Sequence, residues 1–268
     1  MTRPMNSTTP TDAERNAGGG TAAFNGALAE FDYSNFFYSS SDDVFGIFPQ
    51  FDEWYHSHAK NSGYYLFGQP MSTPPRVYIN LQEQLGHKQV ELLNLASYNY
   101  LGLSYHPEVI AAARAALEQY GLGAAGSPLL SGTMDVHMEL EAELARFKGA
   151  GSAIVFPTGY STNVGLIQAL MRPGDWIIMD QNVHASIVDG AILAKSNVRF
   201  FRHNRPEDLD KKLRNTSGRR LVIVEGVYSM DGDVVRLPEI VEVAKRHGAR
   251  ILIDEAHSGF VYGPNGRG

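Results

Sequence analysis

The chain has 268 residues, of which 43% are apolar, and carries a formal charge of −6 from 23 basic and 29 acidic residues. This is enough for one large globular domain or two modest ones. The acidic balance argues against nucleic acid or an anionic membrane as a partner. The absence of cysteine excludes disulfides and thiolate metal sites and favours a cytoplasmic protein. The sequence contains no run of about 18 apolar residues, so we predict no membrane span. Its start is polar, so we predict no secretory signal.

The first 90 residues differ in composition from the rest. Residues 1–23 are rich in Thr, Asn and Gly and poor in apolar side chains, so we predict a flexible tail. Residues 24–90 contain aromatic clusters, such as FFY at 36–38 and WY at 54–55, interrupted by prolines. Such clusters usually pack against a neighbouring domain or subunit, and we interpret this segment in that way.

From residue 91 onward, helical and strand-like patterns alternate. Apolar residues first recur at helical spacing in 107–120 and 135–148, and short apolar runs then alternate with further helices. The predicted strands are 153–156, 176–180, 198–201, 221–225 and 250–254, and the predicted helices between them are 160–171, 185–195, 206–214 and 238–247. This alternation predicts an α/β domain, residues 91–268, in which helices cover a mainly parallel sheet.

The segment 121–126 (GLGAAG) matches the dinucleotide-binding pattern G-x-G-x-x-G. That pattern requires a strand before it and a helix that opens at it, whereas here a predicted helix precedes and Ser127-Pro128 follows. We therefore reject a nicotinamide or flavin site. The glycines instead indicate a loop that closely approaches a ligand or a partner subunit.

Four loops that follow predicted strands carry polar side chains or a glycine turn. They contain Thr158-Gly159-Tyr160, His184, Ser229, and the pair Asp254 and His257. Each has an ordinary structural explanation when taken alone, such as a turn glycine, a helix cap or a satisfied surface histidine. Because ligands bind at the carboxyl ends of strands in open α/β sheets, the four loops together predict one pocket.

The acidic loop 231–233 (DGD) resembles a calcium-binding loop only superficially. No further oxygen ligands follow at calcium-loop spacing. We therefore predict a turn there, and the sequence predicts no metal site.

Several motifs occur in a fixed order between residues 91 and 268. They are NYLGL (99–103), GLGAAGSPLLSGT (121–133), HMELEAELARF (137–147), TGY (158–160), HAS (184–186), EGVYSMDGD (225–233), DEAH (254–257) and GPNGRG (263–268). In this order they resemble the α-oxoamine synthases, a family of pyridoxal-phosphate (PLP)-dependent acyltransferases. The resemblance implies the type I, aspartate aminotransferase-like fold and a homodimer. It also implies condensation of an amino acid with an acyl thioester, usually with loss of carbon dioxide, to give an α-amino ketone.

The resemblance implies a role for each residue around the cofactor ring. Asp254 would pair with the pyridinium nitrogen, which keeps the ring an electron sink. His184 would stack on one ring face and Ala256 would pack against the other. Ser229 and His257 would contact the ring hydroxyl, and His184, Asp254 and His257 form the implied catalytic set.

The resemblance also places the phosphate and the substrate. The phosphate would lie on the 158–160 turn at the start of a helix. Asn99 and the 123–127 loop, with Ser127, would form the substrate end of the site. The chain departs from the family at Pro128, where many members carry arginine, so contacts to a carboxylate or acyl donor there differ.

In the family, the Schiff-base lysine lies in a Ser/Thr-rich segment that would come after residue 268. None of the seven lysines of this chain matches that position. We therefore expect the chain to be the amino-terminal part of a longer enzyme, without the rest of its large domain and its small domain. The alternatives are a lysine-less, non-catalytic partner subunit and another type I PLP enzyme, an aminotransferase or an aldolase.

Overall fold

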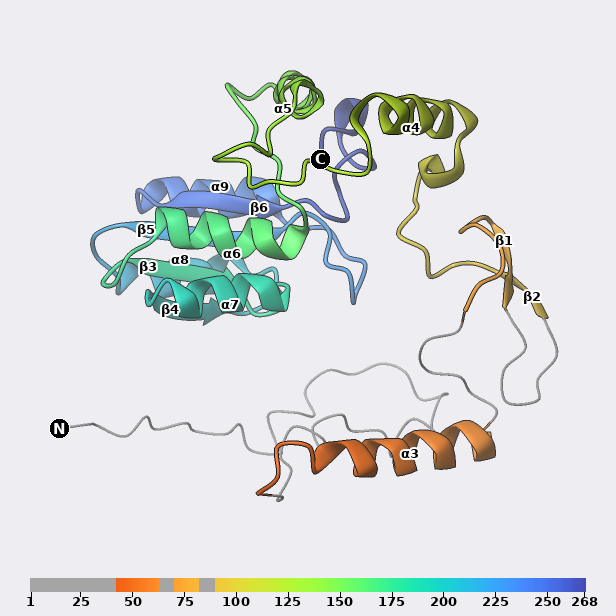
Figure 1. Ribbon diagram of the computed structural model, residues 1–268. Helices are drawn as coiled ribbons and strands as arrows, with labels where there is room; N and C mark the ends of the chain where they lie inside the picture. Colours follow the sequence, from red (N-terminus) through yellow and green to blue (C-terminus); the bar gives the residue numbers. More distant parts are fainter. Residues whose placement is uncertain (1–41, 63–69, 82–89) are drawn as a thin grey trace. The chain divides into compact units, whose positions relative to one another are not determined.

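The computed structural model describes residues 42–62, 70–81 and 90–268 (Figure 1). The predicted tail, 1–23, lies outside the described residues. The chain divides into two compact units, residues 1–94 and 95–268. Within the described ranges, no helix is both long enough and apolar enough to cross a membrane.

The first unit contains helix α3 (Ile47–Ser62) and an antiparallel pair of strands, β1 (Tyr78–Leu81) and β2 (Val90–Leu93). The sequence patterns predicted none of these three elements. In α3 the helical spacing of apolar residues is obscured by aromatic residues and by Pro49. The helix tolerates Pro49 because this residue lies in the first turn.

The second unit is built on a four-stranded parallel sheet. Its strands are β3 (Trp176–Asp180), β4 (Asn197–Phe201), β5 (Arg220–Glu225) and β6 (Arg250–Asp254), in the order β4-β3-β5-β6. Glu225 and Asp254 are register partners at the carboxyl ends of β5 and β6. The predicted parallel sheet is confirmed, and strands distant in sequence bring their final residues to one edge.

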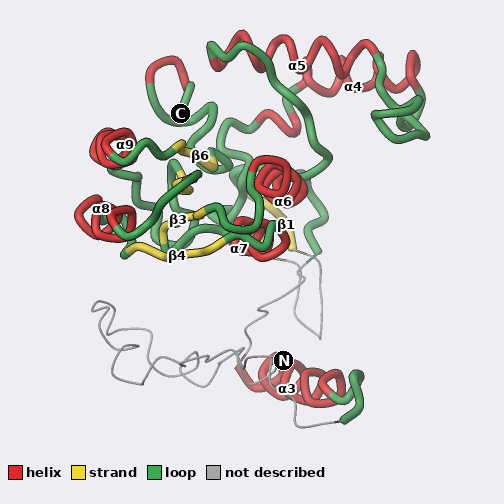
Figure 2. The backbone as a smooth tube through the Cα atoms, turned by 90° about the vertical axis from the view of Figure 1, so that its left-hand side faces the viewer, coloured by secondary structure: helices red, strands yellow, loops and turns green. Residues whose placement is uncertain are grey.

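Helices cover both faces of this sheet (Figure 2). One face carries α6 (Gly159–Leu170) and α7 (Ala185–Leu193), and the other carries α8 (Pro206–Arg214) and α9 (Leu237–Arg246). Ile177 and Met179 of β3 pack into the α6–α7 cluster, whereas Ile178 packs into the α8–α9 cluster. Because both faces are buried, β3 and β5 are almost continuous apolar runs, as parallel strands usually are.

One prediction about the strands needs correction. Residues 153–156 form no strand: Ile154 is 71% exposed, and the Val155 N–H donates to Glu141 Oε1 at 3.0 Å. The reason is that no described strand pairs with this segment, and a strand needs a hydrogen-bonded neighbour. The predicted strand 250–254 does form, and its residues 251–253 are half-buried because β6 lies at the edge of the described sheet.

Helices α4 (Pro107–Tyr120) and α5 (Asp135–Lys148) have the predicted bounds. A 3₁₀ turn, η1 (Leu103–Tyr105), precedes α4, and η2 (Pro264–Gly266) lies near the end of the chain. The glycine-rich loop follows α4 rather than a strand, as predicted. Its glycines let the loop contact itself, since a Cβ on Gly132 would lie 2.0 Å from the Gly126 carbonyl oxygen.

Candidate active site

A pocket of about 680 Å³ lies at the carboxyl end of β6 in the second unit. Its volume is within the range of small-molecule sites. Seven of the ten predicted site residues line it. They come from the starts of α6 and α7, from the end of β6 and the residues that follow it, and from the loop after β5. These seven are Gly159, Tyr160, His184, Ser229, Asp254, Ala256 and His257. The structure thus brings these seven residues together in one pocket.

Asp254 is the last residue of β6, and its two carboxylate oxygens have different partners. Oδ1 accepts the Ala256 N–H at 3.0 Å, and Oδ2 accepts Nδ2 of Asn163 at 2.9 Å. Two donors on two oxygens fix the plane of the carboxylate. Each oxygen retains a lone pair for a further partner.

His184 caps the start of α7, and its ring orientation is fixed through Nδ1. That nitrogen accepts the Ser186 N–H at 3.2 Å and lies 2.7 Å from Ser186 Oγ. A nitrogen that accepts the backbone N–H carries no proton, so neutral His184 holds its proton on Nε2. The ring is thus held in one tautomer at the wall of the pocket.

Glu225, the last residue of β5, lies beneath this region and is only 5% exposed. Its carboxylate accepts the backbone N–H of His184. Burial raises the pKa of Glu225 to about 7; the His184 N–H opposes this rise, and the charges of Asp254 and Asp180 add to it. Sequence reasoning assigned Glu225 no role, although a carboxylate that ends an apolar strand was a usable signal.

His257 is held by two tyrosines that precede α4. Its Nδ1 lies 2.7 Å from the Tyr100 hydroxyl, and the Tyr98 ring meets its ring edge-on with centroids 5.4 Å apart. Tyr98 also lines the pocket. No sequence pattern places residue 98 or 100 next to residue 257, which is more than 150 positions away.

The predicted anion-binding turn opens α6. Thr158 is the N-cap: its Oγ1 accepts the Ser161 N–H at 3.0 Å, so the hydroxyl is used inside the turn and does not line the pocket. Gly159 and Tyr160 do line it, and N–H groups in a first helical turn have no intrahelical acceptor. The Tyr160 hydroxyl donates to Asp189 Oδ2 at 2.7 Å, which raises the pKa of Tyr160.

The predicted substrate residues Asn99 and Ser127 do not line this pocket. Oδ1 of Asn99 accepts the Ser104 N–H at 3.3 Å, and the Ser127 carbonyl accepts the N–H groups of residues 130–132. The Pro128 carbonyl accepts the Thr133 hydroxyl at 2.8 Å. Both assignments to the substrate end therefore stay predictions.

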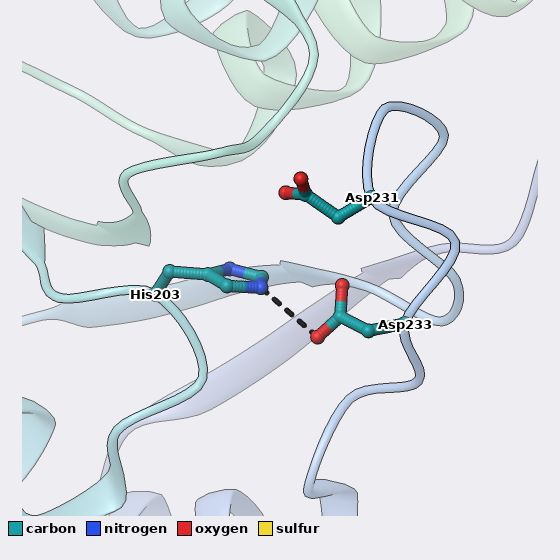
Figure 3. A group of neighbouring side chains, drawn as sticks. All are labelled: His203, Asp231 and Asp233. Carbon is teal, nitrogen blue, oxygen red and sulfur yellow. Dashed lines mark hydrogen bonds and ion pairs between the residues drawn. The ribbon is translucent and has the colours of Figure 1, made fainter. Parts of the chain in front are cut away.

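A second cluster, His203 with Asp231 and Asp233, lies in the loops after β4 and β5 (Figure 3). Ligand atoms of the three lie within 4.8 Å of one another, which would suit one divalent cation. Both ring nitrogens of His203 already face carboxylates, however: Nδ1 lies 2.9 Å from Asp180 and Nε2 lies 3.0 Å from Asp233. Burial lowers the pKa of His203, but these two partners raise it more, with a net rise. We interpret the cluster as a hydrogen-bonded bridge between loops, whose carboxylates favour the protonated form of His203.

Comparison with known proteins agrees with the motif pattern. The family model described as aminotransferase class I and II matches residues 90–267. The serine palmitoyltransferase of Sphingomonas paucimobilis is 50% identical over 176 residues, 65% of this chain and 42% of that protein. The 8-amino-7-oxononanoate synthase of Alkaliphilus metalliredigens is 44% identical over 181 residues, 66% of this chain and 46% of the relative.

Solved structures extend this likeness to the fold. A structure of S. paucimobilis serine palmitoyltransferase with a bound PLP–myriocin aldimine has a TM-score of 0.77 at 41% identity, covering 84% of this chain and 56% of that one. The 8-amino-7-oxononanoate synthase of Francisella tularensis has a TM-score of 0.55 at 28% identity, covering 65% and 48%. The chain thus belongs to the aminotransferase class I and II family and, within it, to the α-oxoamine synthases, which have the type I fold. It spans about half the length of the curated relatives that it matches.

Proposed function

We propose that the chain provides the cofactor-binding part of a PLP-dependent acyltransferase. This enzyme condenses an amino acid with an acyl thioester, on coenzyme A or a carrier protein, and releases carbon dioxide to give an α-amino ketone. The observation that carries the proposal is the single pocket in which Asp254, His184, Ser229 and His257 meet. Identity to serine palmitoyltransferases and 8-amino-7-oxononanoate synthases supports the reaction class.

The pocket residues fit PLP in charge and in hydrogen-bonding capacity. The cofactor, when bound, supplies an electron sink for a carbanion at the substrate α-carbon. Asp254, fixed through both oxygens, would hold a proton on the ring nitrogen. His184 would lie against the ring face opposite Ala256, and Ser229 and His257 would bind the ring hydroxyl.

The start of α6 fits the phosphate. The N–H groups of Gly159 and Tyr160 lie in the first turn of the helix, where the helix dipole favours an anion. Both residues line the same pocket as Asp254. We propose that the Thr158 hydroxyl maintains this turn through its cap to Ser161 and does not contact the ligand itself.

We further propose that the Schiff-base lysine comes from sequence outside residues 1–268. Among the described residues, no lysine lines the pocket. The same observation supports a second candidate function, a lysine-less subunit that pairs with an active homologue. The retained Asp254, His184 and His257 favour the first candidate, because a subunit that does not bind cofactor has no chemical need for all three. Transamination or aldol cleavage on the same fold is a further alternative, which product analysis with and without an acyl thioester distinguishes.

We propose a homodimer located in the cytoplasm. Leu122, Leu129 and Leu130 in the loop after α4 are almost fully exposed, and clustered exposed leucines are typical of an interaction surface. The lack of cysteine is compatible with a reducing compartment. Sedimentation equilibrium of the chain and of Leu129→Asp tests the dimer, which the substitution should weaken.

Binding of PLP to the chain tests the cofactor proposal. We expect saturable binding, measured by quenching of tyrosine and tryptophan fluorescence, and at least a tenfold weaker affinity for Asp254→Ala, because the ring nitrogen loses its partner. Asn197→Ala, at an exposed position of β4, is the matched control and should bind normally.

Borohydride treatment of the PLP complex, followed by peptide mass spectrometry, tests the origin of the lysine. We expect no stoichiometric labelling of any lysine in residues 1–268. Stoichiometric labelling of one of them, with condensing activity lost on its substitution, would show that our assignment of the site is wrong.

A further inference from the structure

A continuous chain of hydrogen bonds connects His184 to Asp254 along the wall of the pocket, where Asn163 and Ser186 also line it. Asn163 Nδ2 lies 2.9 Å from Asp254 Oδ2 and 3.0 Å from Ser186 Oγ, and Ser186 Oγ lies 2.7 Å from His184 Nδ1. Asn163 comes from α6 and Ser186 from α7. Neither residue was singled out from the sequence as a site residue.

The chemistry of these groups fixes the direction of every bond. The Asn163 amide nitrogen has two protons and donates one to Asp254 and one to Ser186. With the amide turned over, its oxygen would face the acceptor Asp254, which is unfavourable. Ser186 Oγ therefore accepts from Asn163 and uses its single proton for His184 Nδ1. This is consistent with His184 Nδ1 also accepting the Ser186 N–H.

Burial makes these bonds difficult to replace. Ser186 is completely buried and Asn163 is 8% exposed. A buried polar group that loses its partner has no water to compensate for it. Truncation at either position should thus change the geometry of the neighbouring pocket residues, and not only the number of hydrogen bonds.

Packing between α6 and α7 does not need this polar pair. Gly190 of α7 lets the helices approach, since a Cβ there would lie 3.1 Å from Cδ1 of Ile167 and 3.3 Å from the Asn163 carbonyl oxygen. Ile167 and Ile187 are buried in the same apolar cluster. Because apolar contacts already hold the two helices together, the hydrogen bonds of Asn163 and Ser186 are available to orient groups at the pocket.

We propose that Asn163 and Ser186 are positioning residues for the cofactor: Asn163 orients Asp254 toward the pyridine nitrogen, and Ser186 sets the ring orientation and tautomer of His184. Asp254 and His184, which would contact different parts of the cofactor ring, are thereby held by one set of hydrogen bonds. This inference depends on the proposed function, because it concerns the same pocket and the same ligand.

A pair of ligands that differ only at the ring nitrogen tests the first half of the proposal. The probes are PLP and 1-deazapyridoxal phosphate, in which a C–H replaces that nitrogen. We expect the chain to prefer PLP by at least tenfold. Asn163→Leu, which is similar in size but donates no hydrogen bond, should reduce this preference at least fivefold while affinity for the deaza analogue changes less than twofold. Asn197→Ala is the control and should keep the full preference.

An isosteric variant covers the case in which Asn163→Leu does not fold. Asn163→Asp places a carboxyl group opposite Asp254 Oδ2, so we expect the preference for PLP to become dependent on pH between 5 and 8. Unchanged, pH-independent preference in this variant would overturn the role of Asn163.

Nitrogen-15 NMR of labelled histidine tests the second half without any ligand. In the chain, we expect His184 to show the shifts of an imidazole protonated on Nε2. Ser186→Ala should change the Nδ1 shift of His184, and Ser186→Thr should restore it. An Nδ1 shift that is the same in all three proteins would overturn the role of Ser186.

The outcomes separate the two proposals. If the unmodified chain binds PLP and the deaza analogue equally, Asp254 does not contact the ring nitrogen and the proposed function fails. If the chain prefers PLP and Asn163→Leu, folded by circular dichroism, prefers it equally, only the positioning role is overturned.

Discussion

Two regions of the molecule have similar apolar spacing but differ in what they bury. The first is the sheet with its four covering helices, residues 159–254. The second comprises helices α4 and α5, residues 107–148. In the first region, α8 buries Leu209 and Leu213, and α9 buries Ile240. Helices α4 and α5, which are both described over their whole length, contain no buried residue. Apolar spacing therefore predicts that a helix forms, but not which surface covers its apolar side.

The same difference explains where the site lies. A polar side chain is oriented strongly only where it is buried and satisfied, and the buried polar residues Asn163, Ser186 and Glu225 all belong to the first region. Among the polar residues of α4 and α5, Lys148 at the end of α5 pairs with Glu255, which lines the pocket, but neither helix contributes a buried polar residue. The first region thus provides buried, oriented polar groups, whereas the polar groups of the second are at least partly exposed.

The largest expected effect comes from removing a core side chain. Ile223→Ala in β5, where the side chain is fully buried, should lower the free energy of unfolding by about 2 to 5 kcal/mol because it leaves a cavity. Leu117→Ala in α4, where the side chain is 50% exposed, should cost less than about 1 kcal/mol. Urea denaturation measures both. Equal losses would mean that α4 is covered in solution, and the contrast between the two regions would not hold.

The second effect concerns the pH dependence of stability. The pKa of Glu225 rises from 4.5 in the unfolded chain to about 7 in the fold, so stability should fall by about 3 kcal/mol as the pH rises from 4.5 to above 7. The sign follows because the unfolded chain releases this proton first. Glu225→Gln, whose amide oxygen still accepts the His184 N–H, should flatten this part of the unfolding profile. A profile that is unchanged in the variant contradicts the pKa assignment.

A smaller effect is expected where α8 meets α9. Oδ1 of Asp210 lies 2.8 Å from Nε2 of His247, and Asp210 also pairs with Arg214. The His247 hydrogen bond lowers the pKa of Asp210, burial opposes this, and Arg214 lowers it further. The stabilisation is therefore present above the unfolded pKa of 3.8 and is lost as the pH falls below it.

Asp210→Asn should thus cost about 1 to 3 kcal/mol at pH 7 and less in acid. Glu143→Gln in α5 is the matched control, because its pair with Arg146 is exposed on both sides and exposed pairs contribute little. Thermal unfolding at pH 7 and pH 3 checks both variants. A larger loss for Glu143→Gln would reverse the comparison of the two regions.

Much of the parallel sheet was predictable because local sequence determines it. Strands 176–180 and 250–254 and helix 206–214 were predicted with the observed bounds, since each is a short apolar or amphipathic run between clear breakers. The segment 153–156 has the same pattern but no described partner strand. Strand formation depends on a neighbour, and local sequence does not specify that neighbour.

The site was predictable to the extent that it depends on topology. Because parallel strands end at one edge, His184, Ser229 and Asp254 were expected together, and they line one pocket. Asn163 was not expected, because it lies inside an ordinary helical pattern and its role depends on the facing side chain of Asp254. Tyr100 was missed for a similar reason, since its contact with His257 joins segments far apart in sequence.

The smallest effect on stability, and the most specific for the site, is expected at Tyr100. Its hydroxyl is 2.7 Å from Nδ1 of His257 in an exposed setting, so Tyr100→Phe should change the free energy of unfolding by less than about 1 kcal/mol. A phenol hydroxyl donates more readily than it accepts, so this contact favours an unprotonated Nδ1 and hence the form of His257 protonated on Nε2. Without it, we expect nitrogen-15 NMR to show His257 as a mixture of tautomers. Tyr98→Phe is the matched control, because it removes a hydroxyl but keeps the ring that meets His257 edge-on at 5.4 Å. If Tyr98→Phe alters the His257 nitrogen shifts and Tyr100→Phe does not, ring packing rather than this hydrogen bond sets the tautomer.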